Sequence, residues 1–220
     1  MSNMNWIKRP VLLFAIFAIP TKTLTGWQIE KFTHIKPNSV STSQNGLTIE
    51  VNGSASPLIY KLAAPLLISG FQISGEFKGL PHFSDVSKQG RKGFDDYALR
   101  VGFVVPGSKR LNGIKKFFAA TWVKHLYREL PAGAGLDHVQ FFDVTQSPEQ
   151  LGHEHTSPSS NLIHENVFAD VKSPGPFFYK YNLSTPLKSA AVWISADGDD
   201  TKSKYTVVIT QIKLDGANVE

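Results

Sequence analysis

The sequence of 220 residues contains no cysteine. A disulfide framework, a zinc–thiolate site and a thiol nucleophile are therefore excluded, and packing alone must stabilise the fold. The sequence also lacks internal repeats, long heptad patterns and low-complexity tracts. These absences agree with a single globular domain.

A strong net charge is also missing. The formal charge is +5 at pH 7, and residues 1–26 carry three of the basic side chains and no acidic one, so the remainder has a formal charge of +2. A nucleic-acid interface needs a clustered basic face, which this balance does not predict. We therefore expect no nucleic-acid partner.

Only one apolar run is long, and it is too short to span a bilayer. Val11–Pro20 has ten apolar residues, whereas a spanning helix needs about 20. The run follows a short basic leader and precedes a polar stretch, which is typical of a secretory signal, although no A-x-A cleavage pattern is present. We expect residues 1–26 to be a signal peptide, with an uncleaved N-terminal anchor as the alternative. The protein would then be exported, to the periplasm or out of the cell, with no membrane span after cleavage.

Residues 27–220 are expected to form one domain made of β-strands. Leu47–Val51 and Phe71–Lys78 alternate apolar with polar residues, the period of a half-buried strand. Further expected strands are Leu58–Leu62, ended by Pro65, and Phe94–Val105, Val139–Val144, Phe177–Leu183, Ala190–Ala196 and Tyr205–Leu214. Turn signals recur and helical periods are rare, which predicts an all-β fold, a single antiparallel β-sandwich of jelly-roll type with long loops.

One segment, Gly113–Leu130, has two possible structures. Its apolar residues recur at helical spacing, so it could be an amphipathic helix with His125 and Arg128 near its end. Within it, Phe117–His125 is rich in aromatic and β-branched residues, which favour a strand. The spacing alone leaves both alternatives open.

The expected strand Phe94–Val105 carries charges within an apolar sequence. Alternation places Asp95 on the core face and Asp96, Arg100 and the small residue Gly102 on the opposite face. Asp96 and Arg100 would be about 13 Å apart along the strand, too far for a direct pair. Either this face is solvated and holds a cross-strand ion pair, or it is a concave wall where a ligand lies between the charges.

A second candidate site is the segment Ser195–Thr201. Asp197, Asp199 and Asp200 place three carboxylates within four residues, an oxygen-rich spacing that calcium prefers. The full EF-hand pattern is absent, because no glutamate follows. The alternative is a hairpin turn in which Asp-Gly supplies a positive φ.

Histidines supply weaker candidates. His153 and His155 would face one way in an extended segment and could bind a transition metal, although an unliganded polar loop explains them equally well. His138 and His164 each lie beside an acidic residue. Neither is accompanied by a serine elbow or an HExxH motif, so the sequence assigns them no reaction.

Several short motifs occur in an order that resembles one family. They are Gly26-Trp27 with Phe32, Ser54–Ser56, Asp95–Val101, Trp122, Asn166–Asp170, Val192–Thr201 and the final strand ending Ile212–Leu214. Together they are similar to a family of exported bacterial proteins catalogued only as a domain of unknown function, number 3047. The Asp-Asp-x-x-x-Arg-Val strand and the Asp-x-Asp-x-Thr loop are its most specific parts.

The resemblance implies a β-sandwich similar to galactose-binding and carbohydrate-binding modules, with the first and last strands adjacent and no settled activity. It also favours a strand around Trp122. The chain departs from the family at Glu165, where an arginine is usual, and at Val171–Pro174, where an arginine-rich stretch is usual. If those arginines serve a ligand, this chain binds a different ligand or none.

Two functions from different classes follow, beside a purely structural role. The first is a non-catalytic module that binds a glycan or cell-wall polysaccharide, with rings that stack on sugars and polar groups that hold hydroxyls. Its expected ligand-binding residues are Asp96, Arg100, Trp122, Asp197, Asp199 and Asp200. The second is a glycoside hydrolase or polysaccharide lyase that uses Asp96 and the Asp197–Asp200 loop. Hydrolysis would need two carboxyl groups about 5 to 9.5 Å apart.

Overall fold

The structure, a computed structural model, describes residues 14–110, 121–157 and 160–219. Within them, eleven strands form one sheet. The strands are β1 (Ala15–Ile19), β2 (Trp27–Ile29), β3 (Ser39–Ser43), β4 (Gly46–Asn52), β5 (Leu58–Lys78), β6 (Leu99–Gly107), β7 (Gly135–Thr145), β8 (Glu154–Thr156), β9 (Ile163–Asp170), β10 (Gly175–Ser195) and β11 (Lys204–Asn218). The described helices are α2 (Thr121–Glu129) and the single 3-10 turns Val86–Lys88 and Pro148–Gln150.

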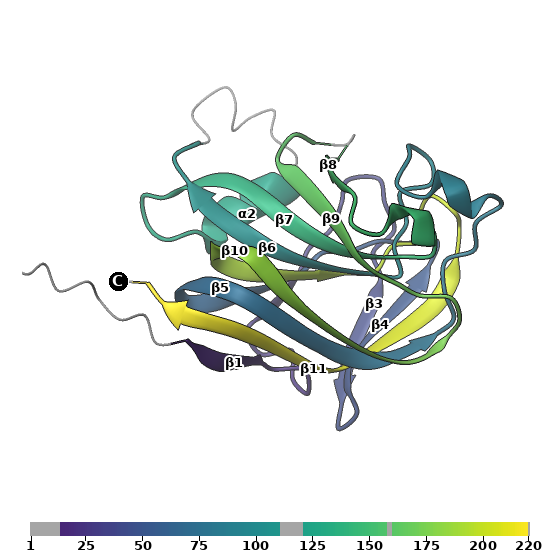
Figure 1. Ribbon diagram of the computed structural model, residues 1–220, viewed down its shortest axis with the longest axis horizontal. Helices are drawn as coiled ribbons and strands as arrows, with labels where there is room; N and C mark the ends of the chain where they lie inside the picture. Colours follow the sequence, from purple (N-terminus) through teal and green to yellow (C-terminus); the bar gives the residue numbers. More distant parts are fainter. Residues whose placement is uncertain (1–13, 111–120, 158–159, 220) are drawn as a thin grey trace, which may run out of the picture.

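The sheet folds into two layers because two of its strands are long. The order is β3-β4-β11-β5-β10-β6-β7-β9-β8, with β1 on β11 and β2 on β5. β5 and β10 pair along most of their length, but the register shifts twice, and such irregularities bend a sheet. Figure 1 shows β6, β7 and β9 in one layer and β5 and β11 in the other. This arrangement confirms the predicted all-β sandwich, although β7 and β9 pair in parallel.

Aromatic rings fill the space between the layers. Phe71 of β5 contacts rings on strands that do not pair with β5, with centroid distances of 5.7 Å to Phe103, 5.2 Å to Phe142 and 5.3 Å to Phe168. Phe71 and Phe103 are fully buried. Tilted and edge-on contacts of this kind are the favourable geometries for aromatic pairs. The core therefore joins the two layers face to face.

The expected strands are present, but several of them merge. Leu58–Leu62 and Phe71–Lys78 both belong to β5, which continues through Pro65. Pro65 lies where the register between β5 and β10 shifts, between the pairs Ser189–Leu66 and Ala191–Lys61, so its missing N–H breaks no ladder bond. The prediction that Pro65 ends this strand is therefore wrong.

The segment around Trp122 is helical, so the strand favoured by the family resemblance is wrong there. Of Gly113–Leu130, the structure describes residues 121–130, and Thr121–Glu129 forms α2. Leu126 and Leu130 of this segment are buried against Leu136 and Val139 of β7. The helical spacing of the apolar residues therefore predicted the structure of this segment correctly. The content of aromatic and β-branched residues, which favoured a strand, did not.

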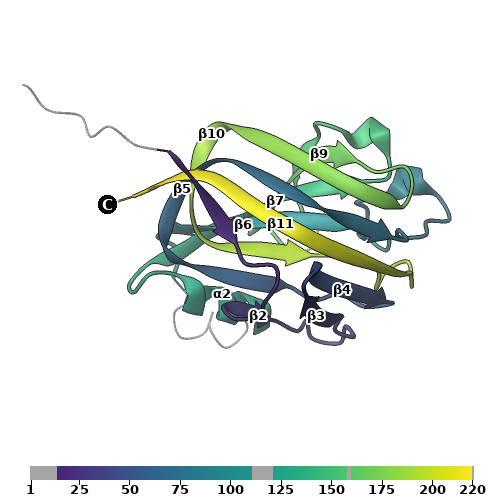
Figure 2. The same ribbon diagram turned by 90° about the horizontal axis from the view of Figure 1, so that it is seen from below.

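Part of the expected signal peptide forms a strand. β1 pairs with β11, from Ala15 opposite Gly216 to Ile19 opposite Ile212 (Figure 2). The indole Nε1 of Trp27 donates to the carbonyl of Pro20 at 2.7 Å. The first and last described strands are thus adjacent, whereas the first strand of the expected domain 27–220, β2, pairs with β5 and not with β11. Cleavage and export stay predictions.

Among the described residues, no helix is long and apolar enough to span a bilayer.

Candidate functional site

A cavity of about 500 Å³ lies on the face of β6, β7 and β10 that carries α2. Four aromatic side chains line it, namely Phe32, Trp122, Phe141 and Trp193. The charged residues that line it are Lys92, Asp95, Arg100, Asp197, Asp199 and Asp200. The cavity therefore gathers five of the six residues that the sequence predicted for ligand binding, all except Asp96.

Strand register explains the aromatic part. Gly102 of β6 lies between Trp193 of β10 and Phe141 of β7, and all three project from the same face. The two rings meet edge to face with centroids 5.2 Å apart. Trp122 of α2 adds a second edge contact to Trp193 at 5.9 Å. The small residue at 102 thus makes room for two rings of the protein, not for a ligand as the sequence had indicated.

Gly102→Ala tests this packing. A Cβ at residue 102 would lie 2.6 Å from Phe141 Cε1 and 3.0 Å from Trp193 Cβ, both closer than normal contact. We expect the free energy of unfolding to fall by about 1–3 kcal/mol in urea denaturation. A shorter side chain in Phe141→Leu should reduce that cost in the double variant. An unchanged unfolding midpoint for Gly102→Ala would contradict this account.

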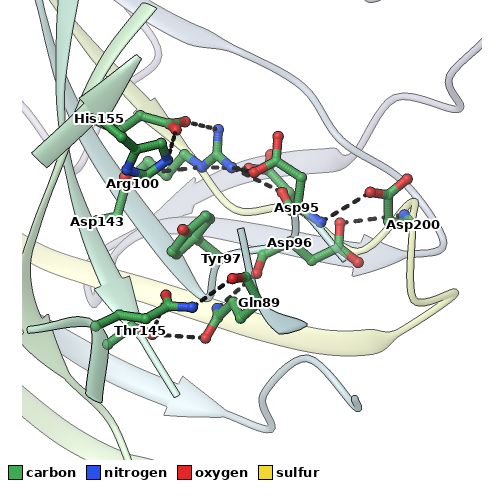
Figure 3. A network of polar contacts seen from close by, with 12 residues as sticks. Gln89, Asp95, Asp96, Tyr97, Arg100, Asp143, Thr145, His155 and Asp200 are labelled. Carbon is green, nitrogen blue, oxygen red and sulfur yellow. Dashed lines mark hydrogen bonds and ion pairs between the residues drawn. The ribbon is translucent and has the colours of Figure 1, made fainter. Parts of the chain in front are cut away.

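Arg100 is the centre of the polar part (Figure 3). It is 8% exposed and contacts four carboxylates. The distances are 2.9 Å from Nη2 to Asp95, 3.2 Å from Nε to Asp197, 3.3 Å from Nη1 to Glu165 and 3.7 Å from Nε to Asp143. One guanidinium therefore faces four acidic groups where the sequence predicted an open polar strand face.

Burial and mutual repulsion keep part of this cluster protonated. Burial is the main cause that raises the pKa of Asp95 to about 6 and that of Asp197 to about 8, although Arg100 opposes both shifts. Burial also raises the pKa of Asp143 well above its usual value. A single cation cannot offset four buried negative charges. At neutral pH, Asp197 therefore holds its proton and Asp95 is mostly ionised.

The ring of Tyr97 packs against the guanidinium of Arg100. The guanidinium carbon lies 4.5 Å from the centroid of the Tyr97 ring, a cation–π contact. The carbonyl oxygen of Tyr97 accepts from the Asp197 amide at 3.1 Å and from the Tyr205 hydroxyl at 3.1 Å. Tyr97 thus joins the start of β6 to the loop that follows β10.

Asp96 has a different position from the one predicted. Residues 94–98 are irregular and β6 begins only at Leu99, so strand alternation does not apply to the two aspartates. Asp96 is 1% exposed, and its Oδ2 accepts from the amide and hydroxyl of Thr201 at 2.7 and 2.6 Å. Asp95, which alternation had assigned to the core face, lines the cavity instead. Asp96 holds the 199–201 turn in place.

A buried amide fixes the irregular segment. Gln89 is 2% exposed, and its Nε2 donates to the carbonyl of Asp96 at 2.8 Å. Its Oε1 accepts from the Thr145 hydroxyl and from the Gln146 amide, both at 2.8 Å (Figure 3). A fully satisfied buried network of this kind is rigid. Gln89 was not a predicted residue, because nothing near it in the sequence marks its role.

The acidic loop does not form a calcium cage in this conformation. The Asp197 carboxylate faces Arg100, and Asp200 Oδ2 accepts from the Asp95 amide at 3.0 Å. Within residues 14–110, 121–157 and 160–219, no group of three acidic or histidine side chains could hold a metal ion. The alternative hairpin turn is also wrong, because β10 and β11 do not pair with each other. The loop instead connects the two layers.

The histidines lie outside the cavity. His155 Nε2 is 2.7 Å from Glu165 Oε2, so a partly exposed imidazole contacts the carboxylate that also reaches Arg100. His138 and His164 stack with ring centroids 4.3 Å apart, and burial lowers the pKa of His164. His153 contributes no metal site with them in the described part of the chain. These histidines therefore do not contribute to the lining of the cavity.

Two members of the Arg100 cluster were missed. Asp143 and Glu165 are 0% and 1% exposed and lie on adjacent strands, β7 and β9. A signal was present for Asp143, a lone acid within the apolar run Val139–Val144. Glu165 had been noted only as a departure from the family. The order of the strands places both acids beside Arg100, and this order could not be predicted from the sequence.

No protein-family model matches the sequence, and no curated protein matches it either. Membership of the family that the sequence resembles therefore stays a prediction.

Solved structures with a similar arrangement include carbohydrate-binding β-sandwich modules. A xylan-binding module CBM15 is 12% identical, with a TM-score of 0.39 over 94% of this chain and 99% of its own. The Ca²⁺-bound exoplasmic/lumenal domain of VIP36 is 10% identical, with a TM-score of 0.40 over 92% and 91%. Winged bean acidic lectin complexed with methyl-α-D-galactose is 14% identical, with a TM-score of 0.38 over 94% and 100%. No role of a residue in this chain is inferred from these similarities.

Proposed function

We propose that the protein is a non-catalytic carbohydrate-binding β-sandwich of the cell envelope. The observation that carries this proposal is the cavity of about 500 Å³ that combines aromatic walls with a few fixed carboxylates. Pockets of this volume with apolar walls and a few convergent polar groups are the usual sites for small ligands. Export remains part of the proposal and is supported by the apolar run at residues 11–20.

A sugar fits both halves of the lining. The apolar faces of a pyranose ring can pack on Trp122 and Phe141, and its hydroxyls can donate to carboxylates such as Asp95 and Asp199. Arg100 holds Asp95 at 2.9 Å, so that acceptor is already positioned before a ligand arrives. Asp96 is not needed, since it is committed to Thr201.

Trp122→Ala is the direct test. Trp122 lines the cavity and is only half-buried, so its loss removes stacking area with a modest effect on the core. On a glycan array, and then by calorimetry with the best glycan, we expect the affinity to fall at least about ten-fold, or 1.4 kcal/mol. Phe178→Ala is the matched control, because Phe178 is 62% exposed and does not line the cavity. Equal binding by both variants, or no glycan bound by the wild type, would contradict the proposal.

The same array decides whether calcium takes part. An ion held by Asp197, Asp199 and Asp200, as the sequence predicted, would require Asp197 to leave Arg100. Binding that persists in EDTA would show that this rearrangement is unnecessary. Binding that requires calcium would assign the ion to the loop.

A second candidate is a hydrolase, favoured by one observation. Asp95 and Asp197 contact the same guanidinium, and their pKa values of about 6 and about 8 differ as those of a catalytic acid and base do. This pair replaces the Asp96 pair that the sequence had indicated. Release of reducing ends from a bound glycan, abolished by Asp197→Asn, would favour the enzyme over the binding module.

A further inference from the structure

The cavity holds more acid than base. The acidic residues that line it are Asp95, Asp197, Asp199 and Asp200, and the basic ones are Lys92 and Arg100. The guanidinium of Arg100 is already paired with carboxylates of the protein, so it does not attract an anionic ligand. Lys92 is exposed to solvent. A ligand in this cavity therefore meets a negative potential, since the neighbouring cation is enclosed by its own partners.

Two of these carboxylates form no ion pair among the described residues. Asp199 is partly exposed and Asp200 is exposed, and no lysine or arginine in the described ranges forms an ion pair with either side chain. Lys202 lies nearby, but its Nζ donates to the backbone carbonyl of Asp199 at 2.5 Å. Burial, Asp96 and Asp200 all raise the pKa of Asp199. Both side chains can receive a positive charge from outside the protein.

An independent observation points to a ligand. Trp193 lines the cavity and is 3% exposed, yet its indole Nε1 has no hydrogen-bond partner among the described residues. A buried indole N–H normally finds an acceptor. The nitrogen atom itself is buried, so a ligand oxygen, such as a sugar hydroxyl, would supply one only if the neighbouring rings move aside. This N–H donor is independent of the acidic residues. It indicates a ligand that carries an oxygen acceptor as well as a positive charge.

The aromatic walls are compatible with a cation. The electron-rich faces of Trp122, Phe141 and Phe32 attract an ammonium group as well as the C–H face of a sugar. A bound cation would also relieve the repulsion that raises the pKa of Asp95 and Asp197. Binding would then release protons from the protein.

We propose that the cavity binds a glycan with free amino groups, such as an oligomer of glucosamine. An ammonium group lies at Asp199 and Asp200, a sugar ring packs on the aromatic walls, and a hydroxyl accepts from Trp193 Nε1. This inference rests on the proposed carbohydrate-binding function and names the chemical class of its ligand.

The test compares glucosamine tetramer with its fully N-acetylated counterpart by calorimetry at pH 6, where the amines are charged. The two oligomers have the same backbone and differ in charge. We expect the amine form to bind at least ten-fold more tightly, with an affinity that falls as salt rises. In buffers of different ionisation enthalpy, its binding should also release protons.

The variant Asp199→Asn/Asp200→Asn should remove this preference, so that the two oligomers bind with similar affinity. Glu76→Gln is the control, since Glu76 is an exposed acid that does not line the cavity. Equal affinity for the two oligomers, or an unchanged preference in the double variant, would overturn the inference and leave carbohydrate binding intact. Failure of both oligomers and of every neutral glycan on the array would overturn the proposed function itself.

Discussion

Arg100→Met should lower the free energy of unfolding by about 3–5 kcal/mol. The substitution keeps an unbranched side chain of similar length but removes the guanidinium that lies within ion-pair distance of Asp95, Asp143, Glu165 and Asp197. Three of these acids are at least nine-tenths buried, so water cannot replace the lost partner. The measurement is urea denaturation at pH 7, monitored by tryptophan fluorescence.

The pH dependence of this loss identifies its cause. At low pH Asp95, Asp143 and Asp197, whose pKa values are raised in the fold, are protonated, so the difference in stability between wild type and Arg100→Met should shrink. At pH 8 it should be largest. Arg128→Met is the control, because Arg128 is exposed on α2 and forms no ion pair through its side chain among the described residues. A deficit that is independent of pH would mean that packing on Tyr97, and not charge, explains the loss.

Strand periodicity predicted the fold well because it depends on local sequence. Leu47–Val51 and Phe71–Lys78 alternate, and each lies within a single strand, β4 and β5. Alternation failed at Asp95 and Asp96, because the chain there is held by hydrogen bonds to Gln89 and to Thr201, which is distant in sequence. The rule requires a strand, and the strand begins only at Leu99.

The candidate site could be predicted only in part for the same reason. Arg100 and Asp197 were recognised as unusual charges, and the structure places them 3.2 Å apart. Their partners Asp143 and Glu165 come from β7 and β9, whose positions beside β6 depend on a parallel pairing that no local pattern indicates. Register decides which side chains meet, and register is a property of the whole sheet.

The wild-type protein should become less stable as the pH rises from 7 to 9. The pKa of Asp197 is about 8 in the folded protein against 3.8 for an ordinary aspartate, so between these two pH values the folded state binds a proton that the unfolded state does not. Stability must therefore fall as the pH rises towards 8 and level off above it. Asp95, with a pKa of about 6, contributes a loss of the same sign at lower pH. Since one pKa unit corresponds to 1.36 kcal/mol, we expect a total loss of about 2–5 kcal/mol between pH 5 and pH 9.

Measurements above pH 7 distinguish the effect of Asp197 on stability from that of His164. Burial lowers the pKa of His164 from 6.5, which makes stability rise with pH, but above pH 7 this imidazole is neutral in both states and has no further effect. Asp197→Asn replaces the protonated acid with a neutral side chain of the same shape. In urea titrations at pH 7, 8 and 9, the free energy of unfolding of the variant should change little. That of the wild type should fall over the same range. Parallel pH profiles for the two proteins would show that Asp197 is ionised in the fold, and the cavity would then carry its full negative charge at neutral pH.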